Sequence, residues 1–187
     1  MKISMTPAML ILLSCMIATT PPMQLCACLL AAGLHELGHI AAAKLLKINL
    51  LQLKLDVLGA RLVTSGRLCS YPALVLLCLC GPLVNFICFG LTLPAIETGS
   101  FVREFCLSSL SLGMLNLIPI EGFDGGRILH GFFCLLFPLD KADQACKFIS
   151  FSCLFCMWGF SVWLLLRIGS SLTLFVFSCS LFAMLFA

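Results

Sequence analysis

Long apolar runs separated by short polar segments recur along the chain and predict a series of membrane-crossing helices. The hydrocarbon layer of a bilayer is about 30 Å thick, so each crossing needs roughly 20 apolar residues. We expect about six crossings, over residues 1–20, 23–46, 72–93, 105–118, 148–168 and 170–187, with polar loops at 94–104 and 138–147. The predicted fold class is an all-α polytopic membrane protein.

The segment Ile48–Tyr71 departs from this pattern. Apolar and polar residues alternate one by one over Leu51–Val57, which is the period of a β-strand with one buried face. Gly59 is the expected turn, and Arg61–Thr64 is a second, shorter strand. We therefore expect a small amphipathic β-hairpin at the membrane surface after the second crossing, with a plain connecting loop as the alternative.

The first apolar run, within Met1–Thr20, is either a retained crossing or a signal peptide. Lys2 is the only positive residue before the run, and no clear small-x-small cleavage site follows it before Pro21-Pro22. We therefore predict that the first crossing is retained.

The composition supports a membrane location. Hydrophobic residues make up 61% of the 187 positions and charged residues only 10%, whereas soluble domains carry about 25% charged residues. We expect one membrane-embedded domain over residues 1–187, with no soluble accessory domain. The net charge is only +3, and no basic patch interleaved with aromatic residues suggests a nucleic-acid partner.

The positive residues predict the orientation, because cytoplasmic loops are enriched in Lys and Arg. With a cytoplasmic N-terminus and alternating crossings, nine of the 11 Lys and Arg residues lie inside, and only Arg103 and Arg167 lie outside. We expect a multi-pass protein in the lipid bilayer of a bacterial inner or cell membrane, with both termini in the cytoplasm.

Thirteen cysteines are present, most of them inside apolar runs. We interpret them as small buried residues kept reduced rather than as a disulfide framework. Cys153 and Cys156 form a C-x-x-C pair, but no second pair accompanies it, so we expect no metal or redox role there.

The second crossing carries His35-Glu36-Leu37-Gly38-His39, an H-E-x-x-H pattern. Residues four apart lie on one face of a helix, so His35 and His39 can present two imidazoles to one metal ion. A catalytic zinc with three protein ligands keeps an open position for water, and Glu36 is placed to accept that water's proton. A chance match is the alternative, but a charged residue at the centre of a membrane helix costs about 2.5–3.5 kcal/mol, which argues for a use.

A hydrolytic zinc site needs a third ligand, and Asp124 is the candidate. It begins Asp124-Gly125-Gly126-Arg127, shortly after Pro119, and the expected topology places it on the same cytoplasmic side as His39. The alternative is a helix cap with no metal role. His130, the remaining histidine, is expected to lie on a helix near the surface without a metal role.

Four strings occur in order within hydrophobic segments: His35–His39, Gly81–Asn85, Asn116–Ile120 and Asp124–Arg127. Together they resemble the site-2 protease family of intramembrane zinc metalloproteases, and most of all its sporulation branch. One departure is Glu121-Gly122-Phe123, where the family has an apolar residue, Pro and Leu. The resemblance implies a compact bundle of membrane helices around one metal site.

The resemblance also implies roles for particular residues. One zinc ion per chain would be bound by His35, His39 and Asp124, with Glu36 as the general base. Three further residues are candidates for contacting the substrate or supporting the ligands: Asn85, Asn116 and Pro119.

On the same resemblance, the partner is a membrane-associated protein precursor, and in the sporulation branch this is a sigma-factor precursor. Another membrane-tethered regulator is the alternative substrate, and a separate inhibitory or activating membrane protein is a candidate partner. Two other classes compete. A membrane metal transporter would spread its ligands along several helices, and an inactive scaffold would have lost the glutamate or a ligand.

Overall fold

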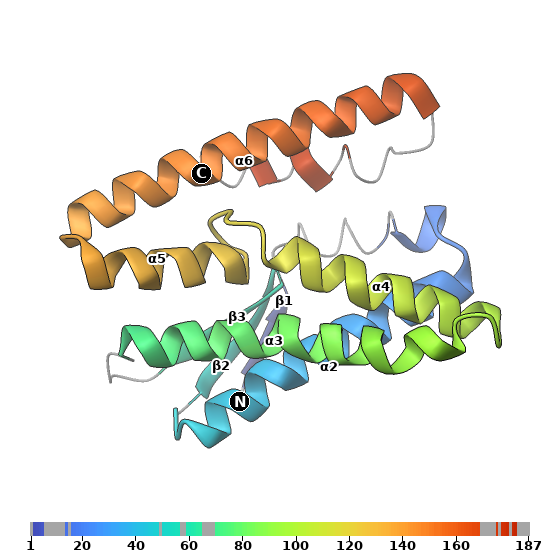
Figure 1. The fold of residues 1–187 in the computed structure, drawn as a ribbon, viewed down its shortest axis with the longest axis horizontal. Helices are drawn as coiled ribbons and strands as arrows, with labels where there is room; N and C mark the ends of the chain where they lie inside the picture. The colour runs from blue at the N-terminus through green and yellow to red at the C-terminus, as the bar shows by residue number, and fades with distance from the viewer. Residues whose placement is uncertain are drawn as a thin grey trace.

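The computed structural model of the chain describes residues 2–5, 14, 16–48, 50–56, 59–64, 70–168, 175, 177–179 and 181–182. Its helices are α2 (Pro22–Leu45), α3 (Tyr71–Thr92), α4 (Ser100–Asn116), α5 (Asp124–Leu136) and α6 (Leu139–Ile168), with the 3-10 turn η1 (Leu93–Ala95) after α3. Figure 1 shows α6 along one side of the molecule, α4 and α5 in the middle, and α2 crossing α3 on the other side.

Within the described residues, three helices are long and apolar enough to cross a membrane: α2, α3 together with η1, and α6. The chain is therefore a membrane protein, but the expectation of six crossings is not supported. The predicted fourth crossing lies on α4, whose 17 residues span about 26 Å at 1.5 Å per residue, which is short of the bilayer core. Half of the predicted first crossing and most of the predicted sixth fall outside the described residues.

A small three-stranded sheet accompanies the helices, in the order β1 (Lys2–Met5), β2 (Leu50–Asp56), β3 (Gly59–Thr64). Strands β2 and β3 pair antiparallel from Asp56 opposite Gly59, with a register shift between Leu50 and Gln52. Strand β1 pairs in parallel with the other edge of β2. The expectation that the first crossing begins at Met1 is wrong for Lys2–Met5, because the open hydrogen-bonding edge of β2 gives this segment a partner that the apolar pattern does not reveal.

Two segments that the sequence predicts as polar loops are partly helical. Helix α4 begins at Ser100, inside the predicted loop 94–104, and α6 begins at Leu139, inside the predicted loop 138–147. Pro138 precedes α6, and Asp140 lies in its first turn, where the positive end of the helix dipole favours a carboxylate. The polar residues at the starts of α4 and α6 suggested loops, but they belong to the first turns of these helices.

Close packing of α2 against α3 prepares the site. The helices α2, α3 and α4 pack on one another, α5 packs on α3, and α6 packs on α5. The buried face of α2 is made of small residues around the histidines, including Ala31, Gly38 and Ala42. A side chain at Gly38 would lie only 2.8 Å from the Cys80 carbonyl oxygen of α3. The absence of a side chain there therefore allows the histidine face of α2 to approach α3.

Candidate metal centre

His35 and His39 lie one turn apart on α2, as the H-E-x-x-H spacing predicts, and both are almost fully buried. Their rings meet edge to face with centroids 4.7 Å apart. The two Nε2 atoms are 3.1 Å apart. A single helix therefore aims two imidazole nitrogens at one point inside the protein.

Asp124 reaches the same point from the first position of α5, 85 residues further along the chain. Its Oδ2 atom lies 3.1 Å from the Nε2 atom of His35 and 3.1 Å from that of His39. Phe123 occupies the N-cap and makes no side-chain capping bond. The carboxylate is therefore aimed at the two histidines rather than at the helix end, and the N-terminal dipole of α5 favours its negative charge.

The segment between α4 and α5 brings Asp124 into place through close backbone contacts. Gly122 has a positive φ of 106°, which an L side chain rarely adopts. A Cβ atom at Gly125 would collide with the carbonyl of Leu117. Ser150 of α6 accepts a hydrogen bond from the Glu121 N–H (2.8 Å) and donates one to the Pro119 carbonyl (3.3 Å). Helix α6 thereby holds the segment that carries the carboxylate.

The three atoms fit a zinc ion. Zinc bonds to imidazole nitrogen and carboxylate oxygen are about 2.0–2.2 Å long, so tetrahedral ligand atoms lie about 3.3–3.6 Å apart. The triangle formed by His35, His39 and Asp124 has edges of 3.1 Å, so a small outward shift of the side chains would admit the ion. Within the described part of the chain, this is the group of His, Cys, Asp and Glu residues whose ligand atoms lie close enough to hold a metal. Two nitrogens and one oxygen leave a fourth position for water or substrate.

Glu36 follows His35 directly on α2 and is half-buried, with its Oε2 atom shielded from solvent. Successive residues of a helix are turned by about 100°. The carboxylate of Glu36 therefore starts from the side of the histidine face rather than from within the ligand triangle. This position suits a base that handles a proton beside a metal.

Helix α3 supports both histidines from behind. The Nδ1 atom of His39 lies 2.9 Å from the Leu77 carbonyl oxygen, and the Nδ1 atom of His35 lies 3.1 Å from the side-chain nitrogen of Asn85. Between them, Gly81 faces the imidazoles, and a Cβ atom there would lie 2.8 Å from the Cε1 atom of His35. The sequence singled out Asn85 but gave no role to Leu77 or Gly81. Leu77, Gly81 and Asn85 are spaced four residues apart, so they lie on one face of α3. This spacing is the signal that could have identified Leu77 and Gly81 from the sequence.

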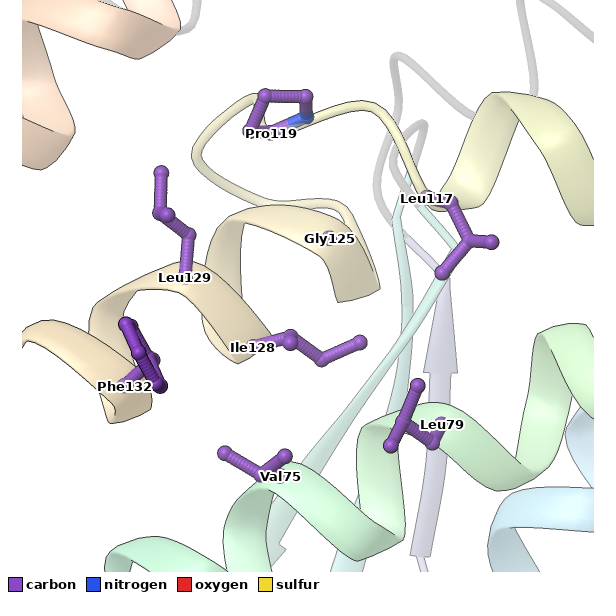
Figure 2. Close-up of a pocket in the computed structure, with 8 residues that line it drawn as sticks. All are labelled: Val75, Leu79, Leu117, Pro119, Gly125, Ile128, Leu129 and Phe132. Carbon is purple, nitrogen blue, oxygen red and sulfur yellow. The ribbon is translucent and has the colours of Figure 1, made fainter.

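Asn116 and Pro119 make contacts other than the ligand contacts described above. Asn116 donates a hydrogen bond to the Leu112 carbonyl of its own helix, at 3.1 Å. Pro119 lines a cavity of about 340 Å³ that adjoins Gly125, the residue after Asp124. Figure 2 shows the apolar side chains around this cavity, which come from Val75 and Leu79 of α3, Leu117 and Pro119 of the joining segment, and Ile128, Leu129 and Phe132 of α5.

His130 lies outside this centre. Its Nε2 atom is 2.7 Å from the Asp143 carboxylate, and this partly exposed pair joins α5 to α6. The eleven described cysteines form no disulfides with one another, and Cys153 and Cys156 belong to no metal-binding group among the described residues.

Comparisons with known proteins bear on the fold. No family model matches the sequence. A curated protein named "Putative zinc metalloprotease" from Ralstonia nicotianae is 33% identical over 115 residues, which cover 59% of this chain but 22% of that protein. The chain thus spans about a fifth of the length of this relative. The solved structure of the site-2 protease from Methanocaldococcus jannaschii matches with a TM-score of 0.67 and 22% identity, over 91% of this chain and 84% of that one. The chain therefore shares the fold of that protein.

Proposed function

We propose that this chain is an intramembrane zinc metalloprotease that cleaves a membrane-associated protein precursor with metal-activated water. The proposal is carried by one observation: the ligand atoms of His35, His39 and Asp124 converge, 3.1 Å from one another, in buried positions of a membrane protein. The name of the Ralstonia relative and the fold shared with the site-2 protease support the same class of reaction.

The residues of the chain would divide the work of peptide hydrolysis. A zinc ion, when bound, supplies a Lewis acid for the scissile carbonyl and for water. His35, His39 and Asp124 would hold this ion. Glu36 accepts the proton of the attacking water and passes it to the leaving amine. The burial of the centre excludes bulk water, which strengthens each electrostatic interaction within it.

The substrate must be extended near the site, because a helix hides its carbonyl groups in its own hydrogen bonds. An extended segment can add to the edge of a sheet through main-chain hydrogen bonds. Strand β1 covers one edge of β2 and β3 covers the other, so the substrate would add at one of these outer strands. We therefore propose that this sheet holds the substrate in an extended conformation.

For the substrate itself, we propose a sporulation sigma-factor precursor as the first protein to test. The proposal follows the resemblance of Asn116–Ile120 and Asp124–Arg127 to the sporulation branch. Another membrane-tethered regulator is the alternative. A cytoplasmic location of both termini, a bacterial membrane and a separate regulatory membrane protein belong to the same proposal.

The experiment compares three forms of the protein, each co-expressed with the tagged precursor in membranes: wild type, Glu36→Gln and Glu97→Gln. Glu97 lies exposed on the η1 to α4 connection, so its variant is a matched control for loss of a carboxylate. We expect a shortened product with wild type and Glu97→Gln and none with Glu36→Gln. All three purified proteins should hold about one zinc per chain by atomic emission.

Two results would contradict the proposal. Cleavage by Glu36→Gln at the wild-type rate would remove Glu36 from the reaction. Loss of zinc in Glu36→Gln would instead make Glu36 a ligand rather than a base. If the precursor is not cut by the wild type, a panel of other single-span membrane proteins separates a wrong substrate from a wrong reaction class.

A further inference from the structure

Asn85 holds an unusual position behind the candidate centre. Its side chain is completely buried on α3, and its side-chain nitrogen lies 3.1 Å from the Nδ1 atom of His35. A Cβ atom at Gly113 of α4 would lie 3.3 Å from the Cβ of Asn85, so α4 confines the amide from the other side. Its Oδ1 atom is buried and has no hydrogen-bond partner among the described residues. A buried amide whose oxygen makes no hydrogen bond is unusual and needs an explanation.

The hydrogen bonds of the two histidines fix where their protons lie. The Leu77 carbonyl can only accept, so the Nδ1 atom of His39 carries a proton and the Nε2 atom of neutral His39 keeps its lone pair. His39 is therefore already in the form that binds a metal through Nε2.

The contact of His35 is different, because the side-chain nitrogen of Asn85 faces its Nδ1 atom. An amide nitrogen can only donate, so with this orientation of the amide a neutral His35 would carry its proton on Nε2. That proton would point to the Asp124 Oδ2 and His39 Nε2 atoms, both 3.1 Å away. A proton on Nε2 would occupy the place of the metal, so ligation through Nε2 requires that the proton of neutral His35 lie on Nδ1.

When the proton moves to Nδ1 of His35, that atom needs an acceptor. A half turn of the Asn85 amide brings Oδ1 to the place now held by the nitrogen, without extra space, since the two ends of an amide are nearly equal in size. The turn gives the idle Oδ1 atom a partner. Ser109, four residues before Gly113 on the same face of α4, also has a buried Oγ atom without a partner among the described residues.

We propose that Asn85 is a positioning residue for the metal centre: its Oδ1 atom accepts the Nδ1 proton of His35 and thereby holds the Nε2 atom as a metal ligand. The inference rests on the metal site of the proposed function. Helix α3 would then orient both imidazoles: the Leu77 carbonyl orients His39, and the Asn85 amide orients His35. Metal ligation and amide orientation are then coupled.

The test measures zinc affinity of purified, metal-stripped protein in detergent by competition with a chelating dye, which needs no substrate. Asn85→Leu keeps the size of the side chain but cannot accept a hydrogen bond. Asn85→Asp restores the acceptor. Gln144→Leu is the matched control, because Gln144 is an exposed amide on α6. Loss of an outer hydrogen bond to a metal-binding histidine typically costs 10–100-fold in affinity.

We expect Asn85→Leu to weaken zinc binding by about 10–100-fold, while Asn85→Asp and Gln144→Leu stay near the wild-type value. Wild-type affinity in Asn85→Leu would overturn the proposal. Equal weakening in the Leu and Asp variants would also overturn it, because packing and not the acceptor would then matter. If the Leu variant does not fold, Asn85→Ala removes the same oxygen and takes its place. A wild-type protein that binds no zinc would instead refute the proposed metal centre.

Discussion

Gly81→Ala is the substitution for which the structure allows the sharpest prediction. Gly81 lies on the buried face of α3 opposite the two imidazoles. An added Cβ atom would collide with the Nε2 atom of His39 and would lie 2.5 Å from its Cε1 atom and 2.8 Å from the Cε1 atom of His35. One methyl group would thus intrude on the two ligand rings while changing no polar group.

The size of the effect follows from these distances. Ordinary van der Waals contact begins at 3.4 Å, so the rings of His39 and His35 would retreat by about 0.9 Å and 0.6 Å. Metal–ligand distances are kept within about 0.2 Å. At least one ligand bond would therefore be lost, and we expect zinc affinity to fall by about 100-fold or more, equivalent to about 2.8 kcal/mol.

Gly90→Ala provides the control on the same helix, because a Cβ atom there meets nothing within 4 Å. Both substitutions gain the helix propensity of alanine, about 0.8–1 kcal/mol. Thermal unfolding in detergent, with and without zinc at about 100 times the wild-type dissociation constant, separates the two. Zinc should stabilise wild type and Gly90→Ala by about 2.7 kcal/mol, but Gly81→Ala by only about 0.4 kcal/mol.

The reasoning would be refuted if Gly81→Ala bound zinc within threefold of the wild-type affinity. The imidazoles of His35 and His39 could then not both be ligands in the arrangement that the structure shows. A drop of the same size in Gly90→Ala would point to a general disturbance of α3 instead.

Two further predictions concern the carboxylate and the segment that carries it. Asp124→Asn keeps the shape of the side chain but removes its charge, so zinc should bind more weakly while the protein stays folded; an unchanged zinc content by atomic emission would leave Asp124 a structural role only. Ser150→Ala leaves the Glu121 N–H without its partner, which should cost about 1–3 kcal/mol of stability in thermal unfolding. Ser152→Ala removes only an exposed hydrogen bond to the Phe148 carbonyl within α6 and should cost far less stability. Equal losses of stability in the two serine variants would contradict the anchoring role of Ser150.

The part of the site that the sequence determined is the part built from neighbours on one helix. His35 and His39 share a face because a helix repeats every 3.6 residues, and this holds wherever the helix lies. The apolar run around them also predicted α2 within one residue at each end. Local periodicity fixes such features before any tertiary contact forms.

The approach of Asp124 was inferred from topology and resemblance, and only the tertiary structure supplies the distances. Its place depends on the turn at Gly122, the close backbone contact at Gly125 and the hold of Ser150 on the preceding segment. None of these contacts produces a repeating pattern in the sequence, so the sequence pattern does not predict them.

The tertiary structure alone decided the roles of α3 and of the first strand. Leu77 and Gly81 look like ordinary apolar and small positions until α2 is packed against them, and Asn85, which the sequence had singled out, gains a defined partner only then. Lys2–Met5 reads as the start of an apolar run until the edge of β2 offers it hydrogen bonds. In each case the deciding partner lies more than 30 residues away, and the pattern of one segment carries no information about which surface it will meet.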